Sequence, residues 1–343
     1  MKRRIYKRIC RWIAAGCLVG LASCAGNVAE DISPEDKGEP ISISFDMYTA
    51  HVTKAETATT EDMVEGKTFR IYAYNSVKSG NPDFSKPVAS AVYRVEKQTV
   101  GGKDRLVAVG DLMLYRGAYY MYLVSYNDES ETPVLDAGTG KITVENKHDF
   151  MYTTLENIIV QPENAGGNHM TVKLPTPFKR LGSRVIVKVA AKNIVQPVDI
   201  STLTVEDVKI GGLPASRTYE LGEATWNSCN VYNSFYQYPK ESFTRPDNSK
   251  FSFWSSTPVV LLPVDGSAEL TFDVNLTVTY DSGSKSLTQV YPASIQKVLA
   301  PGMTYEFEFT LTFYGAIVAT DLTLAVREYD TITLDNKDDG LGK

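Results

Sequence analysis

The chain of 343 residues is poor in the side chains that most often bind metals or carry redox chemistry. It has three histidines, His51, His148 and His169, and their spacing matches no metal-binding motif. It has four cysteines, and only Cys229 lies beyond residue 24. We therefore expect neither a metal ion nor a cofactor in the folded body.

Long apolar runs and basic charge are also scarce. The apolar run near the N-terminus, residues 12–22, has 11 residues, whereas a membrane-spanning helix needs about 20. Six basic residues precede Cys24, so the remaining chain has 29 basic residues (35 less six) against 41 acidic ones, a net charge of −12. A body this acidic is a poor partner for nucleic acid.

Residues 1–23 are typical of a secretory signal peptide, because a basic segment precedes the short apolar run. The segment Leu21-Ala22-Ser23-Cys24 that follows resembles the lipobox of bacterial lipoproteins. We expect cleavage before Cys24 and acylation of its thiol with palmitate, which would anchor the protein in the outer membrane. An ordinary signal peptide cut nearby and an N-terminal membrane helix are the alternatives.

Loss of the signal would simplify the cysteine chemistry. Cys10 and Cys17 leave with the signal and Cys24 carries lipid, so no intramolecular disulfide can form in the mature protein. The remaining Cys229 would need a histidine partner to act as a nucleophile, and a buried or idle thiol is the simpler interpretation.

Alternation of apolar and polar residues predicts β-strands along the rest of the chain. After a polar, acidic tether at residues 24–37, the side chains of Ile41, Ile43, Phe45 and Met47 alternate with polar ones, as in a strand with one buried face. A polar segment at 49–65 predicts a long exposed loop that is open to proteases. The other predicted strands are Phe69–Tyr74, Ala91–Val95, Leu106–Val109, Tyr119–Tyr126, Lys141–Val144, Ile158–Gln161, Arg184–Val189, Thr202–Ile210, Pro258–Pro263, Leu270–Tyr280, Leu287–Tyr291, Tyr305–Tyr314 and Leu322–Leu334.

Two of these segments, Leu270–Tyr280 and Tyr305–Tyr314, alternate most regularly and predict long antiparallel strands with one solvent-exposed face. Residues 281–285 predict the turn of a hairpin. We therefore predict an all-β protein with two tandem antiparallel β-sandwich domains, at residues 38–177 and 178–343.

Short matches to enzyme motifs lack the context that the chemistry needs. Ser282–Lys285 matches S-x-x-K but lies in a predicted turn, where the serine and lysine do not share a helical face. Gly138–Ile142 lacks the hydroxyl residue of a phosphate-binding loop. Asp335–Gly340 lacks the glutamate that closes a calcium loop. We predict that the protein has no catalytic residue and is not an enzyme.

These features together resemble the fimbrillin (Mfa-like) family of type V pilus subunits over nearly the whole chain. The resemblance implies transthyretin-like β-sandwich domains in a structural subunit of a cell-surface fimbria. It also implies other fimbrial subunits as partners and adhesion to a host or bacterial surface receptor. The segments that carry it are Ile43–Phe45, Thr53–Ala55, Phe69–Tyr74, Tyr119–Tyr122, Asp149–Met151, Phe178–Val189 and Leu299–Tyr305.

The resemblance further implies a processing step. In that family an arginine-specific protease cuts the loop after the first strand, and the C-terminal strand of another subunit fills the vacated place. Lys54 stands where the arginine would be, so either a lysine-tolerant protease cuts there or the chain stays uncut. The strand removed would carry Ile41, Ile43, Phe45 and Met47, whose burial is worth about 6 to 12 kcal/mol.

The expected donor strand carries Leu322, Leu324 and Val326, followed by Ile332 and Leu334. Ordinary terminal strands would alternate in the same way. The sequence also leaves open an uncut anchor or tip subunit, a lipid-anchored glycan-binding protein that does not polymerise, and a lipid-anchored hydrolase. The glycan-binding alternative is based on the many aromatic side chains, which could stack on sugars.

Overall fold

The computed structural model of the protein describes residues 38–46, 60–61, 64–77, 81–100, 103–174, 178–193, 200–245, 253–266, 268–280, 282–314 and 317–328. These residues form strands and turns with one 3₁₀ turn, Lys240–Ser242, and no α-helix. None of the described segments is a helix long and apolar enough to cross a membrane. The prediction of an all-β protein is confirmed.

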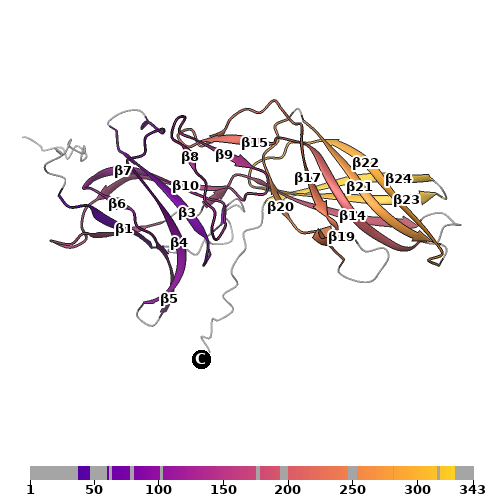
Figure 1. Ribbon diagram of the computed structural model, residues 1–343, viewed down its shortest axis with the longest axis horizontal. Helices are drawn as coiled ribbons and strands as arrows, with labels where there is room; N and C mark the ends of the chain where they lie inside the picture. The colour runs from indigo at the N-terminus through magenta and orange to yellow at the C-terminus, as the bar shows by residue number, and fades with distance from the viewer. Residues whose placement is uncertain are drawn as a thin grey trace, which may run out of the picture. The chain divides into compact units, whose positions relative to one another are not determined.

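The largest sheet has ten strands and comes from the N-terminal part of the chain (Figure 1). In spatial order it contains β11 (His169–Lys173), β1 (Ile41–Asp46), β5 (Lys103–Val109), β4 (Ala89–Val100), β3 (Thr68–Asn75), β7 (Gly117–Ser125), β10 (Met151–Val160), β12 (Phe178–Arg180) and β2 (Thr60–Glu61), with β6 (Met113–Leu114) beside β1. Phe45 of β1 and Phe178 of β12 both contact the ring of Phe69, at 6.4 and 5.6 Å between ring centroids. The sheet therefore curls until distant strands share one core.

The C-terminal part forms two further sheets packed face to face. One contains β18 (Phe243–Thr244), β19 (Trp254–Ser256), β13 (Ser183–Asn193), β23 (Met303–Tyr314) and β24 (Ile317–Glu328), with β20 (Val259–Leu261) beside β13. The other contains β17 (Ser234–Pro239), β14 (Ile200–Leu213), β21 (Glu269–Tyr280) and β22 (Lys285–Gln296). Phe272 of β21 lies 4.8 Å from Phe307 and 5.1 Å from Phe309 of β23, ring to ring. Side chains from both inner faces therefore form one sandwich core.

A small fourth sheet joins strands that lie far apart in the sequence. It contains β16 (Thr225–Trp226), β15 (Ser216–Glu220), β9 (Lys141–Glu145) and β8 (Leu135–Asp136). Its core includes Phe150, Tyr219 and Trp226, with ring centroids 5.2 to 5.6 Å apart. β12 and β15 both lie beyond residue 177 yet pair with β10 and β9. The limit between the domains therefore stays a prediction.

The direction of two strand pairs and the extent of the predicted loop differ from the sequence-based expectations. β13 pairs with β23 in parallel, and β1 pairs with β11 in parallel, whereas antiparallel neighbours were expected. Alternation does not distinguish the two, because it has the same period in both kinds of ladder. The predicted loop at 49–65 contains β2, which is too short to produce a periodic pattern and pairs with β12.

Candidate functional site

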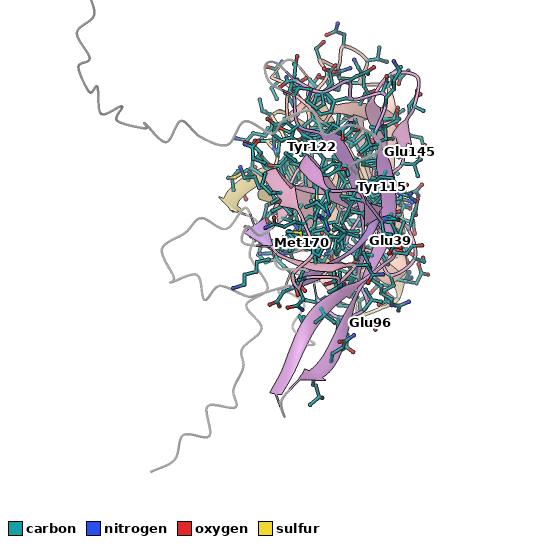
Figure 2. The ribbon with its side chains drawn as sticks, turned by 90° about the vertical axis from the view of Figure 1, so that its left-hand side faces the viewer. Glu39, Glu96, Tyr115, Tyr122, Glu145 and Met170 are labelled. Carbon is teal, nitrogen blue, oxygen red and sulfur yellow. The ribbon has the colours of Figure 1, made fainter. Side chains whose placement is uncertain are left out.

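The first strand, β1, lies inside the ten-stranded sheet rather than at its edge. On one side it pairs in parallel with β11, from Ser42 with His169 to Asp46 with Lys173. On the other side it pairs antiparallel with β5 and β6. Met170 of β11 and Glu39, just before β1, are labelled in Figure 2. A strand with partners on both sides can bond most of its backbone groups within the sheet.

The inner face of β1 is fully buried. Ile41, Ile43 and Phe45 are each 1% exposed, while the residues between them are half-buried. The ring of Phe45 meets the ring of Tyr93 edge-on, with 5.1 Å between centroids. Burial of these three side chains is worth about 4.5 to 9 kcal/mol at about 1.5 to 3 each. Met47, the fourth predicted inward residue, lies outside the described residues.

A tyrosine of β4 bonds the backbone of β1. The hydroxyl of Tyr93 donates to the carbonyl oxygen of Ile43 at 2.6 Å, and it accepts from the backbone N–H of Leu112 at 3.2 Å. The N–H of Ile43 donates to the carbonyl oxygen of Leu112 at 2.9 Å. Tyr93 is 0% exposed, and burial raises the pKa of its hydroxyl to about 12. The hydroxyl therefore stays protonated and able to donate at neutral pH.

A serine on the outer face of β1 contacts a histidine of the neighbouring strand β11. Ser44 Oγ lies 3.1 Å from His169 Nε2 and 3.3 Å from Thr171 Oγ1. These side chains are exposed and lie across a strand pair. A Ser–His contact is what the hydrolase alternative requires, but a nucleophile also needs oxyanion donors within a concave site. Cross-strand hydrogen bonding explains this contact without any chemistry.

The predicted donor strand lies in β24, at one edge of the six-stranded sheet. It pairs with β23 at twelve positions, from Met303 with Glu328 to Tyr314 with Ile317. Leu322 and Leu324 are half-buried and pack against the sandwich core, whereas Val326 is 41% exposed. Among the described strands only β23 pairs with β24, so its other backbone edge is open to a partner.

The remaining predicted site residues are Cys24, Lys54, Ile332 and Leu334, and all four lie outside the described residues. Cys229 is half-buried, and its thiol donates to the carbonyl oxygen of Val231 at 3.3 Å. The described residues contain no group of three or more His, Cys, Asp or Glu that could hold a metal ion.

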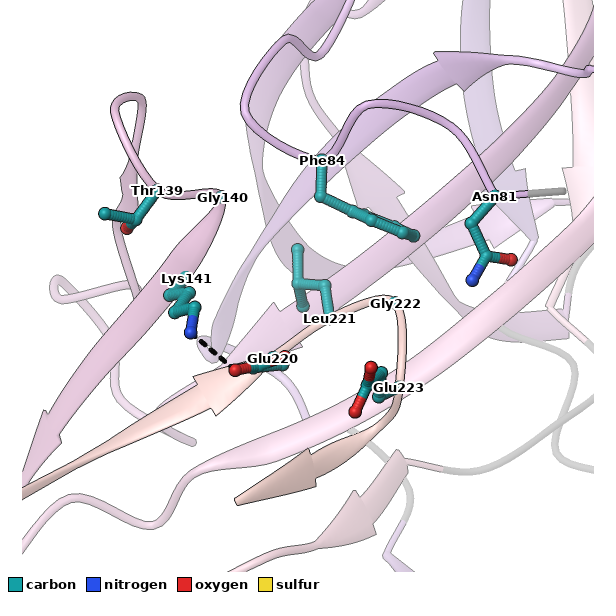
Figure 3. A pocket seen from close by; sticks show the side chains of 9 residues that line it. All are labelled: Asn81, Phe84, Thr139, Gly140, Lys141, Glu220, Leu221, Gly222 and Glu223. Carbon is teal, nitrogen blue, oxygen red and sulfur yellow. Dashed lines mark hydrogen bonds and ion pairs between the residues drawn. The ribbon is translucent and has the colours of Figure 1, made fainter. Parts of the chain in front are cut away.

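A pocket of about 180 Å³ lies where β9 and β15 approach the loop before β4 (Figure 3). Lys141 Nζ bonds Glu220 Oε1 at 2.5 Å in its wall, and Phe84 and Asn81 lie across from them. Small-molecule sites usually enclose about 300 to 1,000 Å³. Because the pocket is smaller than that and Lys141, the one cation among the described residues that line it, already pairs with Glu220, we assign it no ligand.

Sequence reasoning missed Tyr93, Leu112 and the strand β11. Tyr93 lies in a strand that was predicted, Ala91–Val95, but its pattern says only that the ring points inward. Nothing local indicates that its hydroxyl reaches a strand fifty positions earlier. Leu112 and β11 likewise gain their roles only from the strand order.

Comparisons with known proteins agree with this architecture. The family model described as fimbrillin-like matches residues 53–326. The crystal structure of a candidate cell adhesion protein from Bacteroides fragilis has a TM-score of 0.51 at 16% identity, and the match covers 86% of this chain and 100% of that one. A fimbrial protein from Bacteroides vulgatus has a TM-score of 0.47 at 13% identity, covering 85% of this chain and 99% of that one. The tip fimbrial protein Mfa3 from Porphyromonas gingivalis, with a C-terminal truncation, has a TM-score of 0.37 at 10% identity, covering 83% and 99%. No curated protein matches the chain.

Proposed function

The chain belongs to the fimbrillin-like family, whose model matches residues 53–326, and we propose that it is a structural subunit of a cell-surface fimbria that serves adhesion. The subunits join when β1 is removed by proteolysis and a strand from another subunit takes its place. The observation that carries the proposal is that β1, a short strand near the start of the fold, is an interior strand with three fully buried apolar side chains.

Removal of β1 would leave a long apolar groove with open backbone edges on both sides. β5 and β6 would lose their antiparallel partner, and β11 would lose its parallel one. Such a groove favours addition of a strand, because main-chain hydrogen bonds and alternate side-chain pockets are already formed. The occupant must run in the same direction as β1 to satisfy both neighbours.

The proposed donor is the C-terminal segment of a second copy or of a related subunit. Leu322, Leu324 and Val326 have the alternation that the groove needs, and Ile332 and Leu334 repeat it beyond β24. Residues 322–326 already pair with β23, so their transfer would break that ladder. Transfer of the segment that carries Ile332 and Leu334 would leave the ladder intact.

Export and anchoring complete the proposal. The precursor would be cut before Cys24, acylated on that thiol and carried to the outer surface of the outer membrane. Cleavage at Lys54 would then release β1 with the anchor. The N-terminal residue of the surface-exposed protein tests this directly: Ala55 supports a processed stalk subunit, and Cys24 supports an uncut anchor or tip subunit. A Cys24→Ala protein that stays in the membrane fraction would contradict the lipid anchor.

The polymerisation step is tested with the mature chain before and after mild proteolysis near Lys54. We expect detergent-resistant oligomers only after cleavage, and a Lys54→Gln chain should stay monomeric as the matched control. Two truncations, one after Glu328 and one before Asp321, separate the two halves of the donor. If neither truncation changes the oligomers, or if the full chain is monomeric under every condition, the proposal is wrong. Binding to immobilised polysaccharide by such a monomer would favour the glycan-binding alternative.

A further inference from the structure

The ladder beside β1 contains an irregularity of two residues. Met113 of β6 pairs with Ser42, and Ala108 of β5 pairs with Phe45. The two residues of β1 between these positions therefore face four residues, 109–112, on the other side. A bulge of this kind takes backbone groups out of register, so some of them need another partner.

Tyr93 supplies that partner. In a regular antiparallel ladder every second pair of opposed residues exchanges two N–H to O=C bonds. Ile43 and Leu112 keep the first, from Ile43 N to Leu112 O at 2.9 Å. In place of the second, Leu112 N–H donates to the Tyr93 hydroxyl at 3.2 Å, and that hydroxyl donates to the Ile43 carbonyl at 2.6 Å. The hydroxyl is thus inserted into the ladder as a relay.

The position of this hydroxyl is fixed by its surroundings. The Tyr93 ring stacks on Phe69 at 5.6 Å with 14° between the planes, and Phe45 meets it edge-on. The backbone of Gly110 lies so close that a Cβ there would come 2.6 Å from the ring. The ring is therefore enclosed by side chains and backbone and cannot follow a strand that shifts.

We propose that the Tyr93 hydroxyl anchors the main chain of whichever strand occupies the position of β1, either β1 itself or a donor strand. The inference rests on the proposed function and names the residue by which the groove recognises its occupant. The bond is made to a carbonyl, so it does not depend on the side chains of the occupant. Only a residue whose side chain points into the core turns its carbonyl toward Tyr93, because both alternate together along a strand. A strand shifted by one residue could keep the bond only by turning its polar face into the core.

The bond to Tyr93 is lost when the strand leaves, and it therefore slows the release of the strand. Without an occupant, the Tyr93 hydroxyl has no carbonyl to donate to, and its relay from Leu112 N–H ends there. If the hydroxyl is removed while the strand is in place, the Ile43 carbonyl and the Leu112 N–H stay buried without it, and a hydrogen bond lost in this way weakens binding by roughly tenfold. Tyr93 is a positioning residue, since it acts on the backbone of the occupant and performs no chemistry.

The test measures how fast β1 leaves a nicked protein. The full mature chain is given a specific protease site within residues 49–59, is cut there, and is mixed with excess fluorescent peptide of residues 38–48. Uptake of the peptide reports the release of β1. Tyr93→Phe should speed release about tenfold.

Tyr72→Phe is the matched control, because Tyr72 makes the same kind of relay away from β1. Its hydroxyl accepts from Leu135 N–H at 2.7 Å and donates to the Pro133 carbonyl at 3.2 Å. We expect Tyr72→Phe to lower the denaturation midpoint as much as Tyr93→Phe does and to leave the release rate within twofold of the parent.

Each outcome is decisive. If Tyr93→Phe releases β1 at the parent rate, or if Tyr72→Phe speeds release equally, the inference is wrong while the proposed function stands. If the nicked parent exchanges peptide and Tyr93→Phe is faster but no nicked chain forms oligomers, the anchor role holds and the proposed function is wrong. If the nicked parent takes up no peptide at all, both are overturned.

Discussion

Replacing Phe45 with alanine should lower the free energy of unfolding by about 3 to 5 kcal/mol. Phe45 is 1% exposed, and its ring meets Tyr93 at 5.1 Å and Phe69 at 6.4 Å, both edge-on. Transfer of the ring into the core contributes about 1.5 to 3 kcal/mol, and each edge-on contact adds about 0.5 to 1.5. Phe69 and Tyr93 pair with each other in the β3–β4 ladder, so they cannot collapse into the cavity left behind.

The measurement is urea denaturation of the mature chain, followed by the fluorescence of Trp226 and Trp254, which pack against the cores. The midpoint should fall while the slope with denaturant stays constant, because the surface exposed on unfolding hardly changes. Phe45→Leu, which keeps most of the side-chain volume, should lower the free energy of unfolding less than Phe45→Ala does. It replaces the alanine variant in the measurement if that variant does not fold. Ser44→Ala is the matched control on the same strand, since its hydroxyl makes only exposed hydrogen bonds, and it should cost less than about 1 kcal/mol.

The result that would refute this reasoning is a Phe45→Ala loss below about 1 kcal/mol, or one equal to that of Ser44→Ala. Either would mean that β1 does not fill the core as the structure has it. In the nicked chain the same substitution should also speed the release of β1, because the lost contacts exist only while the strand is in place.

Three further predictions concern other parts of the fold. Asp149→Ala should cost about 3 to 5 kcal/mol, because the buried Arg180 guanidinium would lose the carboxylate whose two oxygens it bonds at 2.9 to 3.1 Å; the thermal midpoint measures this. Gly222→Ala should cost about 1 to 3 kcal/mol, because its Cβ would come 2.1 Å from the ring of Phe84, and urea denaturation measures the loss. The contribution of Tyr93 to stability should be constant below about pH 10 and be lost between about pH 10 and about pH 12, because burial raises the pKa of its hydroxyl to about 12 and the unfolded chain releases that proton first; denaturation midpoints in that range check it, and because burial raises the pKa of Tyr126 as well, the Tyr93→Phe chain should still lose stability there, but less steeply.

Each of these has its own check. Gly266→Ala is the control for Gly222→Ala, because only Val298 lies near its Cβ position, at 3.5 Å, and equal losses for the two would contradict the overpacking argument. Asp149→Asn keeps the shape of the side chain and removes only its charge, so it is the control for Asp149→Ala. A neutral result for Asp149→Ala would show that the buried pair does not stabilise the fold. A decline in stability that begins well below pH 10 would have another cause than Tyr93.

The local pattern of the sequence predicted most of the long strands and, where the alternation is regular, which face is buried, but it missed shorter strands such as β11, β15 and β17. Alternation from Ile41 to Phe45 and from Leu270 to Tyr280 appears in the structure as the predicted alternation of burial. The reason is that side chains in a strand point to opposite faces with a period of two, so a half-buried strand shows its environment in its own residues. The turn residues between the two strands likewise predicted the hairpin of β21 and β22.

Only the tertiary structure decided which strands are neighbours. That β1 lies between β11 and β5, that β13 runs parallel to β23, and that β15 pairs with β9 depend on the chain path, and a strand carries no mark of its partner. The role of Tyr93 belongs here too. The sequence places its ring in the core, but a bond from its hydroxyl to Ile43 exists only because folding brings β1 over β4 and opens the ladder at residues 109–112.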